Sequence, residues 1–333
     1  MAVSAHAPLS IWAVSDGRAG IENQVLGLAE AVARLTPAEV APKRLAYKPL
    51  FDRWPNALRL WPDGMLAEGS DRLTPPWPDL MIAAGRASLP FSTRMKRRSR
   101  GRTFVVQVQD PRADLSVFDL VVPPRHDGLE GANVFPITGS PNRISPERLA
   151  EAAAGFAGRL EPLPSPRVAV LIGGASKAYV FSRDRADALA AEIAEAVSAA
   201  GGSVMVTFSR RTPAEVRAAM TARLGGVPGW IWDGEGENPY FAFLAADYIL
   251  VTEDSTNMAT EAAATGKPVF VLKMEGHSHK FRLFHETLER HGAARPFGGG
   301  FHGWTYAPLQ ETDRAAKEIW RRFDSVRAGI GIR

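Results

Sequence analysis

Hydroxyl, carboxylate and basic side chains gather in four turns of this sequence, each placed directly after a short apolar run. The turns lie at residues 15–24, 173–177, 207–213 and 252–269. In an α/β fold the carboxyl ends of parallel strands form one edge of the sheet, and ligands bind at that edge. The residue types in these turns predict two kinds of chemistry, namely proton transfer from a hydroxyl group and binding of phosphate.

The turn at residues 15–24, Ser-Asp-Gly-Arg-Ala-Gly-Ile-Glu-Asn-Gln, precedes a predicted helix. Its two carboxylates, Asp16 and Glu22, could take a proton from an attacking hydroxyl group. As an alternative, Asp16 serves only as the cap of the helix. The glycine spacing is G-x-x-G, so the dinucleotide fingerprint G-x-G-x-x-G is absent from this turn.

Two turns in the second half of the chain are suited to an anion. Residues 173–177, Gly-Gly-Ala-Ser-Lys, offer backbone N–H groups, a hydroxyl group and the ammonium group of Lys177. A plain strand-to-helix turn is the alternative for this segment. Arg210 and Arg211 follow the next strand, and their guanidinium groups suit phosphate oxygens. Thr212 is predicted to cap the helix that comes after them.

The turn at residues 252–269 carries the most information. The polar residues Thr-Glu-Asp-Ser-Thr-Asn follow a strand, and an Ala-rich helix then runs to Thr265, before Gly266 and Pro268. Glu261 lies about two turns into this helix. A carboxylate in this position can accept both hydroxyl groups of a ribose, while the start of the helix attracts phosphate.

Short apolar runs alternate with helical patterns along the chain, which predicts mostly parallel sheets joined by helices. The predicted fold class is α/β, with two Rossmann-like domains facing across a cleft. A single larger doubly wound sheet is the alternative. We expect strands at residues 11–14, 79–83, 103–107, 120–122, 168–172, 203–208, 248–252 and 268–272, and helices at residues 21–35, 184–200, 213–224, 240–245, 256–265 and 311–322.

A proline-rich segment at residues 159–167 separates the two halves. We therefore predict an N-terminal Rossmann-like domain at residues 1–158, a linker at 159–167 and a C-terminal Rossmann-like domain at 168–310. The last helix, within residues 311–333, is expected to pack back on the N-terminal domain.

The Glu-Asp-Ser-Thr-Asn turn, the helix that holds Glu261 and the Thr-Gly-Lys-Pro-Val sequence after it resemble the donor-binding half of GT-B glycosyltransferases. More closely, residues 15–24, 173–177, 209–213 and 253–269 are similar to a bacterial family related to the plant mitochondrial fission factor named for elongated mitochondria, and the similarity covers nearly the whole chain. Bacterial members are described as glycosyltransferases, and the plant member recruits a dynamin-related protein. The resemblance implies a GT-B-like fold, with a nucleotide-sugar donor on the C-terminal domain and an acceptor on the N-terminal domain.

The resemblance also implies roles for single residues. Glu261 would bind the ribose, and Asp16 or Glu22 would be the catalytic base. No metal is implied, because helix dipoles and cations would stabilise the leaving diphosphate and the sequence has no Asp-x-Asp pair. The acceptor-side candidates are Gly17, Arg18, Gly20, Asn23 and Gln24. The donor-binding candidates are Gly173, Gly174, Ser176, Lys177, Ser209, Arg210, Arg211, Asn238, Glu253, Asp254, Ser255, Thr256, Asn257, Glu261 and Lys273.

The leading functional hypothesis is a metal-independent glycosyltransferase that moves a sugar from a nucleotide-sugar to an acceptor of the cell envelope or to a lipid-linked acceptor. The nucleotide-sugar would be a co-substrate, and no other cofactor is expected. One alternative is a non-catalytic scaffold at a membrane surface, as the plant relative suggests. Another is an epimerase that isomerises the nucleotide-sugar on the same two-domain architecture.

The composition excludes several classes of site and partner and indicates where in the cell the protein acts. The 333 residues include no cysteine, which excludes disulfides, thiolate metal sites and a cysteine nucleophile. A net charge of +4 is too small to require nucleic acid as a partner, and none is expected. The sequence shows no secretory signal and no apolar run near the roughly 20 residues that span a bilayer. We therefore predict a soluble, cytoplasmic protein.

A basic stretch suggests an association with a membrane surface. It predicts contact with anionic lipid head groups, and thus a peripheral position on the inner face of the cytoplasmic membrane. A solvated helix face is the alternative, and binding of nucleic acid is a weaker one. The stretch spans residues 94–102 and holds six cations in nine positions, namely Arg94, Lys96, Arg97, Arg98, Arg100 and Arg102.

Two further regions allow more than one interpretation. Trp54, Trp61 and Trp77 stand among several prolines, where they could face an acceptor or a membrane, or simply pack a long loop. His277 and His279 lie two positions apart, as metal ligands sometimes do. We favour a loop that contacts the donor over a metal site at these histidines.

Overall fold

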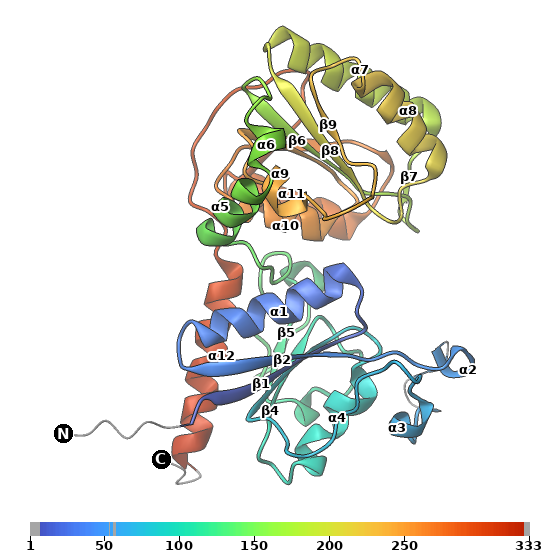
Figure 1. The fold of residues 1–333 in the computed structure, drawn as a ribbon. Helices are drawn as coiled ribbons and strands as arrows, with labels where there is room; N and C mark the ends of the chain where they lie inside the picture. Colours follow the sequence, from blue (N-terminus) through green and yellow to red (C-terminus); the bar gives the residue numbers. More distant parts are fainter. Residues whose placement is uncertain (1–6, 53, 56–57, 330–333) are drawn as a thin grey trace, which may run out of the picture. The chain divides into compact units, whose positions relative to one another are not determined.

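The structure, a computed structural model, divides the chain into two compact units (Figure 1). Unit 1 combines Met1–Arg143 with Gln310–Arg333, and unit 2 is Ile144–Leu309. Each unit contains its own main sheet, of five strands in unit 1 and six in unit 2, which excludes the alternative of one large sheet. The predicted α/β class with two Rossmann-like domains is confirmed. The residues that the structure describes are 7–52, 54–55 and 58–329.

The sheet of unit 1 has the strand order β2-β1-β3-β4-β5, and all neighbouring strands are parallel. In this register Ile11 lies between Val40 and Leu80. The strand β2 was not predicted, because Pro42 and the charged residues of Ala-Glu-Val-Ala-Pro-Lys-Arg hide the pattern; at the edge of a sheet a proline is tolerated. The strands are β1 (Leu9–Ser15), β2 (Ala38–Arg44), β3 (Leu80–Ala84), β4 (Phe104–Val108) and β5 (Leu120–Val122).

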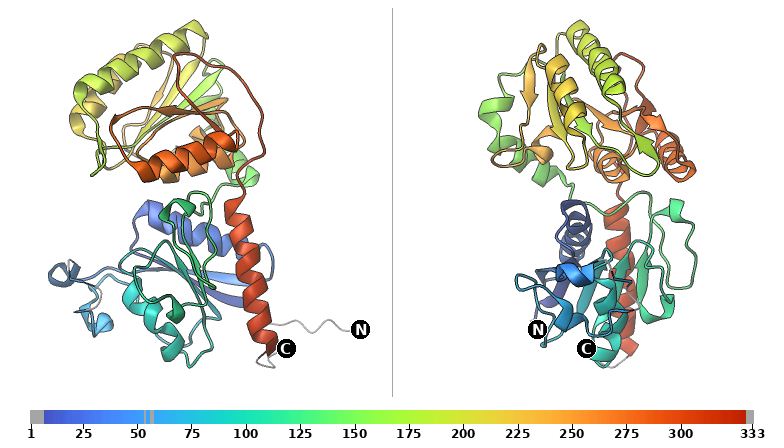
Figure 2. Two further views of the ribbon diagram at one scale, coloured as in Figure 1. Left: turned by 180° about the vertical axis from the view of Figure 1, so that it is seen from behind. Right: turned by 90° about the vertical axis from the view of Figure 1, so that its right-hand side faces the viewer.

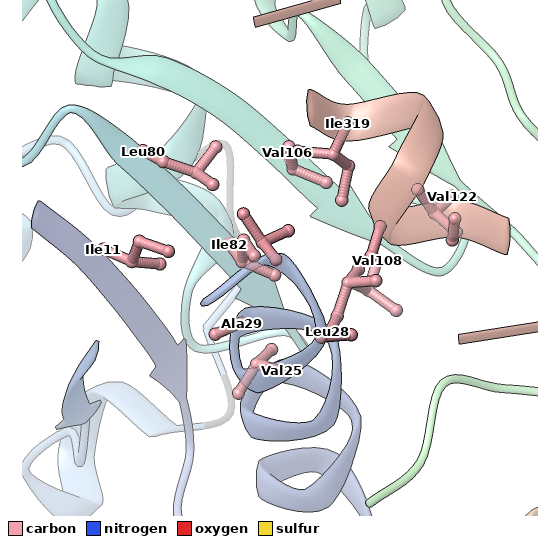
Figure 3. Close-up of a cluster of buried hydrophobic side chains, with 14 of the residues drawn as sticks. Ile11, Val25, Leu28, Ala29, Leu80, Ile82, Val106, Val108, Val122 and Ile319 are labelled. Atoms are coloured by element: carbon pink, nitrogen blue, oxygen red, sulfur yellow. The ribbon is translucent and has the colours of Figure 1, made fainter. Parts of the chain in front are cut away.

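Helices cover both faces of this sheet. On one face α1 (Ala19–Ala33) and α12 (Glu311–Gly329) pack against the strands, and on the other face lies α4 (Leu89–Arg98) (Figures 1 and 2). Figure 3 shows how Leu28 of α1 and Ile319 of α12 lie over the strands; both side chains are fully buried. The short helices are α2 (Pro49–Asp52), α3 (Pro62–Met65) and two 3-10 turns, Leu115–Val117 and Arg125–Asp127.

The main sheet of unit 2 has the order β13-β11-β10-β6-β8-β9, again with parallel neighbours. Its central strands match the predicted ones, whereas the short edge strands β9 and β13 carry too few apolar residues to be predicted. A separate antiparallel pair joins β7 to β12. The strands are β6 (Arg167–Ile172), β7 (Tyr179–Val180), β8 (Ser203–Phe208), β9 (Gly229–Ile231), β10 (Tyr248–Thr252), β11 (Val269–Leu272), β12 (Glu275–Gly276) and β13 (Ala294–Pro296).

The helices of unit 2 also form two layers around the sheet. On one face α7 and α8 pack on a core that includes Val170 and Val206, and on the other face α5, α9, α10 and α11 surround Val251 and Phe284. Of these, α5 and α11 were not predicted. The helices are α5 (Pro146–Gly155), α6 (Ala157–Leu160), α7 (Arg183–Ala199), α8 (Ala214–Leu224), α9 (Tyr240–Phe243), α10 (Thr256–Ala264) and α11 (His279–Arg290).

The boundary between the units lies before the proline-rich segment. Residues 159–167, which we predicted as a linker, lie inside unit 2 and include the end of α6 and the start of β6. Leu160 is buried in the core of this unit, and Phe156 packs against the same core. The chain therefore passes between the units at 143–144 and again at 309–310, where α12 returns to the core of unit 1.

Within the part of the chain that the structure describes, no helix combines the length and the hydropathy needed to cross a membrane.

Candidate functional site

Four polar loops share one edge of the main sheet of unit 2. They follow β6, β8, β10 and β11, which are neighbours in the sheet and run parallel, so their carboxyl ends lie on the same side. This arrangement brings together most of the predicted donor-binding residues. The loops are residues 173–178, 209–213, 253–255 and 273–278.

Asp254 ties three of these loops together. Its carboxylate accepts hydrogen bonds from the N–H of Gly174 (3.0 Å) and the hydroxyl group of Thr252 (2.7 Å), and it forms an ion pair with Arg211 (2.9 Å). The side chain of Asp254 has no exposed surface. A Cβ atom at position 173 would lie 2.1 Å from Oδ1 of Asp254, so only glycine allows this approach.

The same hydrogen bonds occupy the backbone N–H groups of Gly173 and Gly174. The N–H of Gly173 donates to Thr252 Oγ1 (2.7 Å), and that of Gly174 donates to Asp254, so neither N–H group points to a free anion site. The prediction that Thr212 caps α8 is wrong: Pro213 holds the cap position, and the Thr212 hydroxyl donates to the carbonyl of Gly173. Lys177 and Arg210 remain exposed at this edge.

Ser176 and Ser209 have local roles in their turns. The hydroxyl oxygen of Ser176 accepts from the N–H groups of Ala178 and Tyr179, both at 3.2 Å. That of Ser209 accepts from the N–H of Arg211, also at 3.2 Å. Both hydroxyl groups therefore shape the loops from which the neighbouring cations extend.

Glu253 lines a polar hollow. It is 7% exposed, and its carboxylate pairs with Lys273 (3.0 Å) and accepts from the N–H of Met274 (2.7 Å). The carbonyl oxygen of Glu253 lies 2.9 Å from Nε2 of His285, and burial lowers the pKa of this histidine. The hollow measures about 360 Å³ and is lined by Tyr179, Glu253, Lys273, Met274, Gly276, His277, Ser278, Arg282, His285, Glu286 and Glu289.

Glu261 is a buried carboxylate on α10. The helix begins at Thr256, where the hydroxyl oxygen of Ser255 accepts from the N–H of Met258 (3.3 Å). Burial raises the pKa of Glu261 to about 7, and the hydroxyl group of Tyr240, which donates to the carboxylate, partly opposes that rise. In the ionised form Glu261 can accept further hydrogen bonds, as its predicted contact with a ribose requires.

Other candidates on this side lie close to the same helix. Asn238 is exposed, and its side-chain oxygen accepts from the N–H of Tyr240 (3.0 Å), which holds the start of α9. Thr256 and Asn257 occupy the first turn of α10 and are partly exposed. Backbone N–H groups in the first turn of a helix attract anions, so the predicted contact with phosphate fits this position.

The candidate base residues lie in unit 1, in surface ion pairs. Asp16 accepts from the N–H of Arg18 (3.1 Å) and from its guanidinium group, and Glu22 pairs with Arg44 (2.6 Å). Arg18 holds the cap position of α1, so the alternative in which Asp16 caps this helix is wrong. The arginine side chains of both pairs are largely exposed.

The acceptor-side candidates surround these pairs. Gly17 has a φ of +74°, which favours glycine, and Gly20 and Asn23 lie in the first turns of α1. Gln24 is buried, and its side-chain oxygen accepts from Nε2 of Gln109 (2.9 Å). Gln109 itself has a φ of +70°, a strained conformation that a sequence pattern does not reveal.

The basic stretch on α4 is only partly available at the surface. Arg94 donates to the carbonyl of Arg59 (3.1 Å), Lys96 pairs with Asp119 (2.8 Å) and Arg98 pairs with Asp63 (3.2 Å). The remaining three cations, Arg97, Arg100 and Arg102, are exposed.

The helix α11, which was not predicted, also contributes to the site. Arg282, His285, Glu286 and Glu289 of this helix line the hollow beside Glu253. A signal was present: Ser278 caps the helix, and Phe281, Phe284 and Leu288 recur at helical spacing. Among the described residues, no group of three His, Asp or Glu side chains is placed to hold a metal ion, and this includes His277 and His279.

Comparison with known proteins places the chain in a family. The family model described as "Mitochondrial fission ELM1" matches residues 19–323. The chain belongs to this family. The mitochondrial fission protein ELM1 of Arabidopsis thaliana is 34% identical over 272 residues, which cover 73% of this chain and 64% of the plant protein. An uncharacterized protein of Rickettsia prowazekii (strain Madrid E) is 26% identical, over 93% of this chain and 98% of the relative.

Solved structures of low sequence identity share the fold of this ELM1-family chain. The UDP-GlcNAc 2-epimerase of Methanocaldococcus jannaschii matches with a TM-score of 0.54 at 11% identity, over 95% of this chain and 100% of the enzyme. A second structure of that epimerase, in complex with UDP-GlcNAc and UDP, matches with a TM-score of 0.50 at 12% identity, over the same shares of both chains. At such identities the likeness shows the fold alone. It agrees with the predicted GT-B-like architecture of two Rossmann-like domains.

Proposed function

We propose that this chain binds a nucleotide-sugar at the carboxyl edge of the unit 2 sheet and transfers the sugar to a hydroxyl group of an acceptor. The observation that carries the proposal is Glu261, a buried carboxylate on α10, with the first turn of that helix at the same sheet edge as the exposed cations Lys177 and Arg210. A carboxylate for the ribose and positive groups for the phosphates are the two elements that a nucleoside diphosphate requires.

The fold comparison supports this ligand class. The Methanocaldococcus jannaschii epimerase that shares the fold was solved with UDP-GlcNAc and UDP. In our proposal Glu261 accepts the ribose hydroxyl groups, and the first turn of α10 with Thr256 and Asn257 contacts the phosphates. Because Asp254 occupies the N–H of Gly174, the Gly-Gly turn positions Arg211 and shapes the loop instead of binding phosphate directly.

The transfer step follows from these roles. A carboxylate of unit 1, Asp16 or Glu22, takes the proton of the acceptor hydroxyl group as its oxygen attacks the anomeric carbon. The bond between that carbon and the phosphate oxygen breaks, and the electron pair leaves with the diphosphate. Lys177, Arg210 and the start of α10 stabilise the leaving charge, so the proposed step needs no metal. The acceptor belongs to the cell envelope or is linked to a lipid, and the protein acts at the cytoplasmic side.

The donor site can be tested by ligand-induced stabilisation. A panel of nucleoside diphosphates, with UDP and UDP-GlcNAc included, is added to the full chain and the unfolding temperature is recorded. A ligand at 100 times its Kd adds about 2.7 kcal/mol to the free energy of unfolding. We expect at least one nucleotide to raise the temperature for the wild type and the Glu195→Gln control, and not for Glu261→Gln. Glu195 is an exposed residue of α7. No response of the wild type to any nucleotide would contradict the proposal.

An epimerase is the second candidate, because the shared fold is that of UDP-GlcNAc 2-epimerases. This enzyme would use the same donor site but no acceptor. Incubation with a nucleotide-sugar alone distinguishes the two reactions: an isomerised nucleotide-sugar identifies the epimerase, whereas a transferase leaves the donor unchanged until an acceptor is added.

A non-catalytic scaffold is the third candidate, and the match to a mitochondrial fission protein favours it. Such a scaffold keeps the fold but needs no intact donor site. A cellular phenotype of the gene deletion that Glu261→Gln fully complements, at equal protein level, would support the scaffold. Loss of complementation would support the enzyme.

A further inference from the structure

Large apolar side chains are exposed in one short segment of unit 1. We call Leu50, Trp54, Leu58, Leu60 and Trp61 the Leu/Trp segment; their exposed fractions are 71%, 38%, 55%, 57% and 73%. In the described part of the chain, the other large apolar side chains with comparable exposure are Leu35, Val180, Leu283 and Val326, which belong to separate elements. Single exposed apolar residues are ordinary, whereas a concentration of them marks a binding surface.

The burial pattern within the segment is inverted. Arg59 is only 1% exposed, although it stands between the exposed Leu58 and Leu60. Its guanidinium group lies over the ring of Tyr47, 4.0 Å from the ring centre. A charged side chain is normally outside and leucine inside, so the opposite arrangement indicates that the outer side of the segment meets an apolar environment.

Contacts with the body of unit 1 hold the segment in this orientation. Arg94 donates to the carbonyl of Arg59 (3.1 Å), and Arg86 donates to the carbonyl of Trp54. At the base, Met65 and Leu66 are buried in the core on the α4 side of the sheet. Figure 1 shows α2, which holds Leu50, and α3, which follows Trp61, standing out from the sheet of unit 1. The hydrogen bonds from Arg86 and Arg94 therefore hold the backbone of the segment while its leucine and tryptophan side chains stay exposed.

The charged side chains around the segment indicate which kind of partner would bind it. The groups that contact the segment and α3 are cationic: Lys48 donates to the carbonyl of Gly64, and Arg86 and Arg94 contact the segment itself. The acidic residue Asp63 is paired with Arg98. Tryptophan and leucine beside lysine and arginine are the side chains that settle at the interface of a bilayer with anionic lipids.

We propose that the Leu/Trp segment inserts into the head-group region of an anionic bilayer, with the cations around it in contact with lipid phosphates. This moves the main membrane contact from the basic stretch at residues 94–102 to Leu50, Trp54, Leu58, Leu60 and Trp61. The inference does not depend on glycosyl transfer, since a scaffold or an enzyme could use the same surface. For a transferase it would bring the protein to a lipid-linked acceptor.

The test is co-sedimentation of the full chain with large unilamellar vesicles. One vesicle preparation contains phosphatidylcholine alone, and the other contains equal parts phosphatidylcholine and phosphatidylglycerol. We expect the wild type to bind the mixed vesicles, and to bind the neutral ones at least about tenfold more weakly, since each cation near an anionic surface adds a several-fold gain in affinity. No lipid-dependent sedimentation of the wild type would overturn the proposal.

The variant Leu60→Asp/Trp61→Asp should reduce binding to the mixed vesicles by about tenfold or more, because charged groups oppose insertion. Both side chains are exposed, so this variant should keep the far-ultraviolet circular dichroism of the wild type. The matched control is Leu35→Asp, which charges an exposed leucine elsewhere in unit 1 and should bind as the wild type does.

Two other results would overturn the proposal. If Leu60→Asp/Trp61→Asp binds as the wild type does while Arg97→Glu/Arg100→Glu does not, the basic stretch is the membrane contact. If light scattering shows a wild-type dimer that Leu60→Asp/Trp61→Asp converts to a monomer, a second copy of the chain covers the segment. Nucleotide-induced stabilisation is measured without lipid, so failure of this inference and failure of the proposed function are distinguishable.

Discussion

The carboxylates at the carboxyl edges of the two sheets differ in how the protein holds them. In unit 2, Glu253, Asp254 and Glu261 are each 7% exposed or less and bonded to neighbouring loops or helices. In unit 1, the side chains of Asp16 and Glu22 are each 14% exposed, and their main partners are arginine side chains that are 63% and 67% exposed. The fold thus fixes the carboxylates of unit 2, whereas exposed ion pairs cost little to break. The edge of unit 2 is therefore suited to a ligand of defined shape. At the edge of unit 1, the carboxylates can change their rotamers and turn toward a substrate.

The largest expected effect comes from the removal of Asp254. Asp254→Ala leaves the Thr252 hydroxyl and the Gly174 N–H without an acceptor and breaks the pair with Arg211. We expect the free energy of unfolding to fall by about 3–5 kcal/mol, measured by urea denaturation. The matched change in unit 1, Asp16→Ala, should cost less than about 1 kcal/mol. If the free energy of unfolding fell equally in the two variants, the carboxylates of the two edges would not differ in how firmly the protein holds them.

A second prediction concerns pH. The pKa of Glu261 is raised from 4.5 to about 7, so the folded chain keeps this proton where the unfolded chain has released it. Stability is therefore lost as pH rises from about 4.5 to 7, by up to about 3 kcal/mol, and the loss persists above that range. Glu261→Gln lacks this group, so its stability relative to the wild type should increase by that amount between pH 4.5 and pH 8.

The variant Tyr240→Phe tests the same pH dependence of stability. It removes the hydrogen bond that lowers the pKa of Glu261, so the loss of stability should extend to higher pH than in the wild type. A constant difference between Glu261→Gln and the wild type across this range would show that burial does not raise the pKa of Glu261.

The smallest expected effect is the difference in stability between alanine variants of two glycines, Gly174 and Gly17. A Cβ atom at position 174 would lie 2.2 Å from the carbonyl oxygen of Arg211, so Gly174→Ala must shift the backbone and should destabilise unit 2 by about 2–3 kcal/mol. At Gly17 the nearest atom to such a Cβ is 3.7 Å away, and only the φ of +74° opposes alanine. Gly17→Ala should therefore cost about 1 kcal/mol. Thermal unfolding of the two variants measures the difference.

Much of the fold could be predicted because buried parallel strands are short apolar runs. The strands at Val168–Ile172 and Ser203–Phe208 stand out in this way, and the glycines and prolines between elements mark their limits. The edge strand β2 could not be recognised by the same pattern, since its sequence is rich in charge, and α11 shows only the helical spacing of Phe281, Phe284 and Leu288 among many charged residues. The boundary at 143–144 was also hidden, because Phe156 and Leu160 pack on unit 2 from a segment that looks like a linker.

The position of the candidate site could be predicted better than its internal contacts. Polar residues after parallel strands must share one sheet edge, so residues 253–257 and 273 were expected there. The direction of each side chain could not be predicted, because Glu253 and Asp254 are adjacent carboxylates that both suit a ligand. The structure turns Asp254 inward, where Gly173 and Gly174 leave the space, and the predicted phosphate contacts of the two glycines are replaced by protein contacts.

The return of α12 to unit 1 has a consequence for synthesis on the ribosome. Unit 2 is continuous in sequence, so all of its residues are available before the chain is finished. Unit 1 is split around it, and Ala315, Ile319 and Phe323 of its core are made after unit 2. Domains that are complete in sequence can fold while the rest of the chain is still being translated. We therefore expect unit 2 to reach its native state before unit 1, because unit 1 is incomplete until α12 has left the exit tunnel.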